Sequence, residues 1–478
     1  MFLKIILKLL ILTSPVCCFV GYIGGFRYLM KEVASSVSIG STPRHETRWL
    51  DQKLDHFDEN ENRTWKMRYF KRLDFWKLNG PIFLFLGGES ETSPNFLYTG
   101  IMYELAKETN GALYASEHRY YGKSLPVNET AVEKFKYLSA KQALADNAHL
   151  LRSFKSKPFF ANSKIVVVGG SYAGNLAAWM RLLYPDLVDA AIASSAPVLA
   201  KKDFYEYLET VNTDYAQYGT SGCLKSINKL FINYESMFET QEGIKKLKEE
   251  ENICPENDMS IPENKQLFFL EKASAFMSNA QYGNTKKIND HCANVNETKK
   301  YLLFDEPSFW IKRSDCNDLD FNNMINDNYK NKINWIVCWT YQTCTEYGYF
   351  QSTSSNKQPF TNNIPVDFYV KLCTKTFGSE FNDTRIDDGI EDVNRIYGGL
   401  QPNVSKVVFV NGDLDPWSRL SILEDISYDA PAIVIPRASH CRDLFSNREN
   451  DHEELKEARK NVKHLIKRWI NAEDYIAN

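Results

Sequence analysis

One continuous segment, KIVVVGGSYAGNLAAWMRLLYP, limits the fold of this chain more than any other. Residues 164–168 are a short apolar run of the kind that forms a buried strand, and residues 172–184 have the pattern of a helix that ends before a proline. Ser171 lies at the turn between them. A serine at such a turn adopts a strained backbone conformation that presents its hydroxyl group for reaction. The segment predicts a nucleophile at Ser171; the alternative is a glycine-rich turn with an incidental serine.

The residues two positions before and after Ser171 have to be small, because strand and helix approach each other closely at this turn. Gly169 and Ala173 meet this requirement. The usual pattern has glycine where Ala173 stands, so we expect its methyl group to lie at a crowded contact. This departure keeps one alternative open, a catalytically inactive chain of the same fold that binds peptide or protein.

Further apolar runs are typical of central strands in a parallel sheet, and helix-like segments such as residues 141–154 lie between them. These runs cover residues 81–86, 190–193, 406–410 and 432–435. A C-terminal helix over residues 451–471 is expected to cover the sheet with one apolar face, formed by Leu455, Ala458, Val462, Leu465 and Trp469. The alternation predicts an α/β architecture.

Two acidic residues and one histidine follow predicted strands downstream of Ser171. Asp413 and Asp415 lie in NGDLDPWS, at the carboxyl end of the strand over residues 406–410, where α/β sheets hold their sites. His440 follows the next strand, in RASHCRD. The other histidines precede Asp415 or lie on the C-terminal helix, so none of them fits the expected loop. Asp413 and Asp415 are rival candidates for the partner of His440.

The chain order Ser, Asp, His is that of the α/β-hydrolase fold, a mostly parallel sheet flanked by helices. Serine is a weak nucleophile at its own pKa, so His440 is expected to take its proton while a carboxylate orients the imidazole. The oxyanion of the tetrahedral intermediate needs backbone N–H donors. We expect one from Tyr172, directly after the nucleophile, and one from the early turn LFLGGES, with Gly88 as the candidate and Gly87 or Glu89 as alternatives.

A chain of 478 residues is too long for one ordinary compact domain. The predicted hydrolase domain therefore has two parts, residues 45–200 and 376–478. Between them, residues 201–375 have few strand-like runs and long charged helical patterns, which predicts an inserted helical cap domain.

The N-terminal residues 1–26 have the layout of a signal peptide, with an uncleaved signal anchor as the alternative. Eight cysteines follow, spread singly and without the paired short spacings of zinc sites, so disulfides are expected and neither metal nor cofactor is predicted. Sequons for glycosylation begin at Asn62, Asn128, Asn296, Asn382 and Asn403. The net charge of -4 comes from interspersed charges, which argues against a nucleic-acid partner. No later segment is apolar enough to span a bilayer, so no stable membrane association is expected if the leader is cleaved.

Many motifs, in the same order, resemble the serine carboxypeptidase family that holds lysosomal prolyl carboxypeptidase, dipeptidyl peptidase II and thymus-specific serine protease. These motifs are DQKLDHF, RYF, FLGGE, EHRYYGKS, YLSAKQALAD, GGSYAGNLAAWMR, ASSAPV, WTYQTCTEYGYFQ, NGDLDPWS and SHC. The resemblance runs from about Leu50 to the C-terminal helix, and YQTCTEYGYFQ is most similar to the thymus-specific branch.

The resemblance assigns the catalytic triad to Ser171, Asp415 and His440, and so favours Asp415 over Asp413. It implies a secreted or lysosomal serine exopeptidase that acts on short peptides, commonly after proline, as a carboxypeptidase or a dipeptidyl peptidase. It further implies a disulfide between Cys344 and Cys373 and a proline-accepting pocket that includes Trp417, for which core packing is the alternative. An esterase or lipase with the same machinery is a third hypothesis, and a homodimer is an alternative to a monomer.

Overall fold

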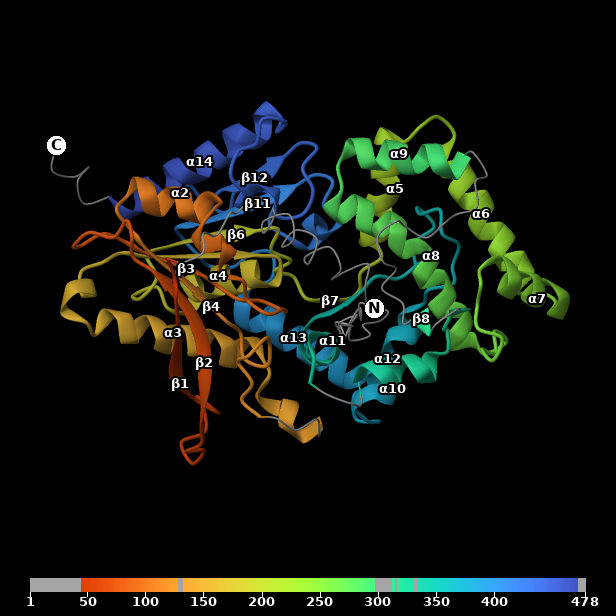
Figure 1. Ribbon diagram of the computed structural model, residues 1–478, viewed down its shortest axis with the longest axis horizontal. Helices are drawn as coiled ribbons and strands as arrows, with labels where there is room; N and C mark the ends of the chain where they lie inside the picture. Colours follow the sequence, from red (N-terminus) through yellow and green to blue (C-terminus); the bar gives the residue numbers. More distant parts are fainter. Residues whose placement is uncertain (1–43, 128–131, 297–311, 314–315, 330–332, 472–478) are drawn as a thin grey trace, which may run out of the picture.

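The computed structural model describes residues 44–127, 132–296, 312–313, 316–329 and 333–471 (Figure 1). The predicted leader, residues 1–26, lies outside this part of the chain. Among the described helices, none combines the length and the apolar composition needed to cross a bilayer.

One eight-stranded sheet forms the centre of the hydrolase domain. The outer strands β1 and β2 run antiparallel to each other, β2 is also antiparallel to β4, and the remaining neighbours are parallel. In spatial order the strands are β1 (Glu46–Lys53), β2 (Thr64–Arg72), β4 (Ala112–Ser116), β3 (Ile82–Phe85), β5 (Ile165–Gly170), β6 (Ala190–Ser194), β11 (Val407–Gly412) and β12 (Ala432–Ile435). The predicted central strands are confirmed, and the sheet with its flanking helices is that of an α/β hydrolase.

Helices cover both faces of this sheet, because successive side chains of each strand point to opposite sides. On one face Ile82 and Leu84 share a core with α3 (Ala140–Lys155) and α4 (Tyr172–Leu183). On the other face, Phe83 and Phe85 share a core with two helices, α2 (Ile101–Glu108) and α14 (Glu453–Ile470). Figure 1 shows α2 and α14 together on one side of the strands and α3 on the other.

The C-terminal helix α14 covers the sheet as expected. Leu455, Ala458, Val462 and Trp469 are buried in the core of that face. Leu465 is only partly buried, and Ile466 takes the central place instead. A helix advances about 3.6 residues per turn, so the step from Val462 to Ile466 follows the buried face more closely than the step to Leu465.

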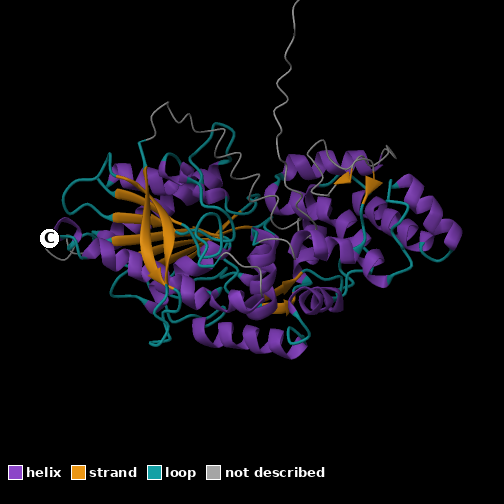
Figure 2. Ribbon diagram, turned by 60° about the horizontal axis from the view of Figure 1, so that its bottom comes forward, coloured by secondary structure: helices purple, strands orange, loops and turns teal. Residues whose placement is uncertain are grey.

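Between β6 and β11 the chain leaves the sheet and forms what we call the helical insertion, residues 195–406. Figure 2 shows its helices packed beside the sheet. Its described helices are α5 (Glu206–Tyr218), α6 (Cys223–Met237), α7 (Gln241–Glu250), α8 (Pro262–Tyr282), α9 (Thr285–Asn296), α10 (Phe321–Tyr329), α11 (Trp335–Gln342), α12 (Val366–Phe377) and α13 (Asp383–Tyr397). Short strands complete it: β7 (Lys201–Asp203) pairs with β10 (Gly348–Phe350), and β8 (Lys312–Arg313) with β9 (Cys316–Asn317). The predicted boundary at residue 375 falls within α12.

Disulfides tie the helical insertion together. They join Cys223 to Cys292, Cys254 to Cys316, and Cys344 to Cys373. Each closes a long loop of the unfolded chain, and such a cross-link typically stabilises the folded state by about 2–4 kcal/mol. Cys344 lies in a single turn of π-helix, Thr343–Tyr347, which continues α11.

Candidate active site

Ser171 lies at the sharp turn between β5 and α4. Its φ of 59° and ψ of -134° place a non-glycine residue in a strained region of backbone space. The Ser171 N–H donates to the carbonyl oxygen of Ser194, 2.9 Å away on the adjacent strand β6. A Cβ atom on Gly169 would lie 1.9 Å from the Ala173 carbonyl oxygen. Only glycine fits at residue 169, as the elbow pattern requires.

The methyl group of Ala173 lies at the crowded contact that the sequence predicts. A Cβ atom on Gly88 would lie 3.3 Å from the Ala173 Cβ and 3.5 Å from the Ala173 nitrogen. The methyl group is accommodated because the facing residue has no side chain. Gly88 therefore lies directly against the first turn of α4, beside Tyr172. Tyr172 is the first residue of α4, so its N–H has no acceptor within the helix.

The carboxylate of Asp415 uses both of its oxygen atoms. Oδ1 accepts a hydrogen bond from the Trp417 N–H at 3.1 Å and so caps the 3₁₀ turn Pro416–Leu420. Oδ2 lies 2.8 Å from His440 Nδ1, and both side chains are fully buried. The rival Asp413 is exposed, and its Oδ1 accepts from the Arg437 N–H at 2.6 Å. Of the two candidates, Asp415 is therefore the carboxylate bound to His440.

Burial and Asp415 act in opposite directions on the pKa of His440. Burial lowers this pKa. The negative charge of Asp415 and its hydrogen bond raise the pKa by more than burial lowers it, so the pKa lies well above the ordinary value. With Nδ1 bonded to Asp415, Nε2 is the ring nitrogen left for proton transfer. Within the described part of the chain, Nε2 has no hydrogen-bond partner.

The helical insertion holds the loop that carries His440. The His440 N–H donates to the Gln281 carbonyl oxygen at 2.8 Å, and Ser439 Oγ donates to the Gly283 carbonyl oxygen at 2.9 Å. The ring of Tyr282, the last residue of α8, meets the His440 ring edge to face at 5.7 Å between centroids. The C-terminal end of α8 thus holds the backbone of the His440 loop and packs against the imidazole.

Cys441, the residue after His440, contacts the turn that carries Ser171. Cys441 has a positive φ of 57°, and its N–H donates to Ser195 Oγ at 2.9 Å. A Cβ atom on Gly170 would lie 3.0 Å from Cys441 Sγ. Since Gly170 precedes Ser171, the loops that carry the predicted nucleophile and the predicted base touch each other.

The tyrosine side chain next to the nucleophile is locked into a buried polar network. The Tyr172 hydroxyl lies 3.0 Å from His118 Nε2 and accepts from Gln342 Nε2 at 3.0 Å. Gln342 Oε1 in turn accepts from the Tyr121 hydroxyl at 2.7 Å. This network connects the start of α4 to α11 and so fixes the backbone of Tyr172. All four residues lie in motifs noted in the sequence, but the motifs gave no sign that their side chains meet.

Trp417 lies in the core. Its exposure is 0%, and its ring packs against Phe204, Tyr207 and Tyr349 at centroid distances of 5.1, 5.8 and 5.3 Å. A fully buried ring offers no surface to a substrate in this structure. Its environment is that of the core-packing alternative, in which Trp417 supports the loop of Asp415.

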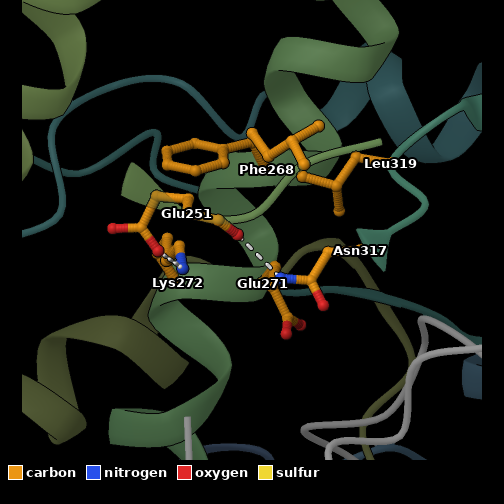
Figure 3. Close-up of a pocket in the computed structure, with 7 residues that line it drawn as sticks. Glu251, Phe268, Glu271, Lys272, Asn317 and Leu319 are labelled. Atoms are coloured by element: carbon orange, nitrogen blue, oxygen red, sulfur yellow. Dashed lines mark hydrogen bonds and ion pairs between the residues drawn. The ribbon is translucent and has the colours of Figure 1, made fainter. Parts of the chain in front are cut away.

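A small cavity lies inside the helical insertion, and several polar groups that line it bind one another (Figure 3). Lys272 Nζ lies 2.5 Å from Glu251 Oε2, and Asn317 Nδ2 donates to the Glu251 carbonyl oxygen at 2.8 Å. None of the predicted catalytic residues lines this cavity. We assign it to the packing of the insertion.

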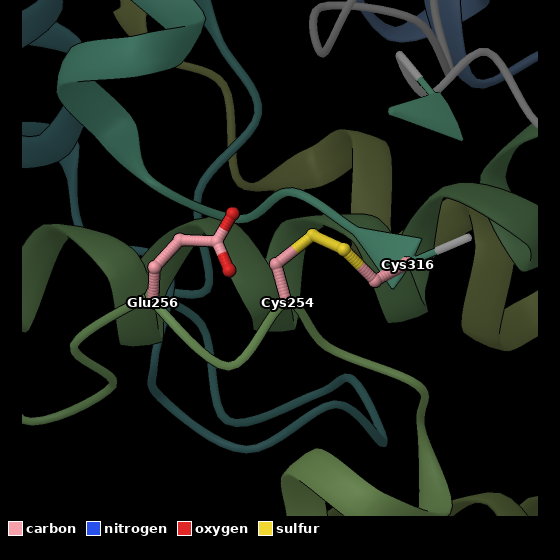
Figure 4. Close-up of side chains that lie close together, drawn as sticks. All are labelled: Cys254, Glu256 and Cys316. Carbon is pink, nitrogen blue, oxygen red and sulfur yellow. A yellow bond between two sulfur atoms is a disulfide. The ribbon is translucent and has the colours of Figure 1, made fainter. Parts of the chain in front are cut away.

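The sulfur atoms of Cys254 and Cys316 come close to the carboxylate of Glu256, a combination that resembles a metal-ligand set (Figure 4). The two sulfur atoms are bonded to each other in a disulfide. Neither can act as a thiolate ligand while this bond exists.

The predicted sequons lie on the surface where the structure describes them. Asn62, Asn382 and Asn403 are exposed. Asn128 and the residues that complete the sequon of Asn296 lie outside the described residues.

A comparison with known protein families identifies the family of this chain. The model of the family described as serine carboxypeptidase S28 matches residues 52–462. The chain belongs to this family. It is 30% identical to the thymus-specific serine protease of Mus musculus, an alignment that covers 90% of this chain and 88% of the relative. It is 29% identical to the lysosomal Pro-X carboxypeptidase of Homo sapiens, with 88% of each chain covered. The S28 chain is a serine peptidase.

Proposed function

We propose that this S28 peptidase cleaves short peptides at one end, with Ser171 as nucleophile, His440 as base and Asp415 as the residue that orients His440. The observation that carries the proposal is the hydrogen bond from His440 Nδ1 to Asp415 Oδ2, made by two buried side chains next to the strained turn of Ser171. It fixes the tautomer in which Nε2 can accept a proton.

The reaction would proceed in two halves. The Ser171 hydroxyl oxygen attacks the peptide carbonyl carbon while His440 Nε2 takes the proton, and the Tyr172 and Gly88 N–H groups bind the oxyanion. The C–N bond then breaks, and His440 gives its proton to the leaving amine. Water, activated by His440, attacks the remaining ester and releases the acyl part, which restores the Ser171 hydroxyl group.

Burial supports cleavage at a chain end over cleavage within a folded protein. Ser171 is 3% exposed and His440 0%, and the end of α8 lies against the His440 loop. A substrate has to enter a site of this kind with a narrow segment, which favours short peptides and chain ends. A preference for proline is part of the proposal because one relative is a Pro-X carboxypeptidase by name.

We also propose that the enzyme works in the secretory pathway, either secreted or in lysosomes, and two features support this. Disulfides such as Cys223–Cys292 persist in oxidising compartments, and exposed asparagines such as Asn62 can carry glycans. The sequence relatives include a lysosomal enzyme.

Active-site labelling of the full-length secreted protein tests this proposal. A fluorophosphonate should label Ser171 in wild type and fail to label Ser171→Ala, as shown by peptide mapping. A panel of proline-containing peptides, blocked at either the N- or the C-terminus, should be cut from one end only. Folded wild type that reacts with neither the label nor any peptide would instead support an inactive, peptide-binding chain.

A further inference from the structure

Two buried serines at the end of β6 have no part in the proposed mechanism. Ser194 is the last residue of this strand and Ser195 follows it, and their exposures are 0% and 1%. We call them the serine pair. In the sheet, β6 lies between β5, which leads to Ser171, and β11, which leads to Asp415. The serine pair therefore lies between two of the three residues proposed for catalysis.

The backbone of the serine pair binds both neighbouring strands. The Ser194 carbonyl oxygen accepts the Ser171 N–H at 2.9 Å, and the Ser195 N–H donates to the Val410 carbonyl oxygen of β11 at 2.7 Å. Ser195 has a φ of 45°, a positive value that is strained for a residue with a Cβ atom. Glycine would adopt it with less strain, but glycine has no hydroxyl group. In this conformation Ser195 Oγ reaches the loop that carries His440.

The side chains of the serine pair bind that loop at two points. Ser195 Oγ accepts the Cys441 N–H at 2.9 Å, and Ser194 Oγ donates to Asp443 Oδ1 at 2.5 Å. Asp443 is 2% exposed, and hydrogen bonds that a carboxylate accepts are among the stronger ones in proteins. Both contacts lie within three residues of His440 in the chain. The loop is thus anchored to the end of β6 on either side of Cys441 and Asp443.

The backbone around His440 is held from two sides. Its own N–H donates to the Gln281 carbonyl oxygen of the helical insertion at 2.8 Å, and the next N–H in the chain donates to Ser195. The hydrogen bond between His440 and Asp415 involves the ring, but it does not set how far the ring lies from Ser171. That distance depends on the serine pair, whose backbone holds the turn of Ser171 and whose hydroxyl groups hold the loop of His440.

We propose that Ser195 and Asp443 are positioning residues that keep the His440 imidazole within reach of the Ser171 hydroxyl group. This inference rests on the proposed function. Removal of either side chain leaves the backbone hydrogen bond between Ser194 and Ser171 in place, so its effect on the reaction acts through His440. A displacement of about 1 Å between reacting groups can lower a rate by about 100-fold.

The rate of fluorophosphonate labelling tests this role without knowledge of the peptide substrate. Ser195→Ala should lower the second-order rate constant for labelling of Ser171 by about 10- to 100-fold. Asp443→Ala removes the acceptor of Ser194 and should lower it as well, whereas Asp443→Asn keeps an oxygen acceptor and should keep most of the rate. The control Ser163→Ala should behave as wild type. Ser163 is equally buried, its Oγ has no hydrogen-bond partner among the described residues, and it lies before β5, at the opposite end of that strand from Ser171.

A double-mutant cycle with His440→Ala separates positioning from a general loss of structure. Because Ser195 acts through His440, Ser195→Ala should not slow the residual labelling of His440→Ala any further. Three results would overturn the inference: Ser195→Ala labels at the wild-type rate, it slows labelling by the same factor in the His440→Ala background, or Asp443→Asn is as slow as Asp443→Ala. Circular dichroism first establishes that each variant is folded. Any of these results beside normal labelling of wild type refutes the positioning role alone, and absent labelling of folded wild type refutes the proposed function itself.

Discussion

Replacement of Asp214 by asparagine should make the protein more stable at neutral pH. Asp214 lies on α5, is 3% exposed, and within the described chain its Oδ2 has no hydrogen-bond partner. Burial raises the pKa of its carboxyl to about 9, and the negative charge of Asp413 adds to the shift. The positive charge of Arg419 opposes the shift, but its guanidinium donates to Thr210 Oγ1 at 3.0 Å.

The size of the effect follows from proton linkage. The pKa of Asp214 is raised in the folded state, so the folded protein holds a proton that the unfolded chain releases above pH ~4. Stability is therefore lost as the pH rises from that value toward the folded-state pKa of about 9. At pH 7 the unfolded chain has passed its own pKa by about three units, which corresponds to about 4 kcal/mol. Asparagine resembles the protonated carboxyl in shape and does not ionise, so Asp214→Asn escapes this loss.

Thermal unfolding across a pH series measures this difference. With an unfolding entropy of about 2.1 cal/mol/K per residue, a chain of 478 residues changes its Tm by roughly 1 °C per kcal/mol, so Asp214→Asn should melt about 4 °C above wild type at pH 7. The gain should vanish near pH ~4, where wild-type Asp214 is protonated in both states. The exposed Asp388 on α13 provides the control Asp388→Asn, which should follow wild type at each pH. A Tm difference that is independent of pH, or a loss of stability at pH 7, would refute the reasoning.

Three further predictions concern the site. Asp415→Asn should lower kcat by about 10⁴-fold without unfolding the protein, because the imidazole loses its correct tautomer; steady-state kinetics and circular dichroism check this. Gly88→Ala should lower kcat at least about tenfold, since its Cβ would meet the Ala173 methyl group at 3.3 Å, and Ala173→Gly in the same chain should restore part of the loss. The pKa of His440 is raised despite burial, so kcat/KM for an amidated peptide should fall with decreasing pH, about tenfold per unit below that pKa. A rate that is flat in this range would show that His440 is not the base.

Most strands that the sequence predicted are buried on both faces, but the predicted β12 is only partly buried, and β4, which is fully buried, was not predicted. β5 and β11 are fully buried, and each is a continuous apolar run in the sequence. The outer strand β1 is mostly exposed, and β2 alternates between buried and exposed residues, so neither forms such a run. Their place in the sheet depends on antiparallel pairing with each other and with β4, which no local pattern records.

The residues proposed for catalysis were predictable for a different reason from those that position them. Ser171 sits in a local motif, and Asp415 and His440 follow strands whose carboxyl ends meet at one edge of the sheet. Gln281 and Tyr282 lie at the end of a cap helix, and their contact with His440 joins distant parts of the chain. Such contacts depend on how the insertion packs against the sheet, which the apolar pattern of α8 does not specify.

In the proposed mechanism, the helical insertion therefore helps to position the catalytic residues. The N–H of His440 is held by the carbonyl oxygen of Gln281, whose side-chain Oε1 accepts from the Tyr207 hydroxyl of α5 at 2.6 Å. Tyr207 also packs against Trp417, two residues after Asp415. A single set of contacts thus supports both the His440 loop and the Asp415 loop. Since the carbonyl end of a helix favours positive charge, the end of α8 would also stabilise the His440 imidazolium of the proposed mechanism. Movement of α5 or α8 away from the sheet would therefore disturb both the geometry and the basicity of His440.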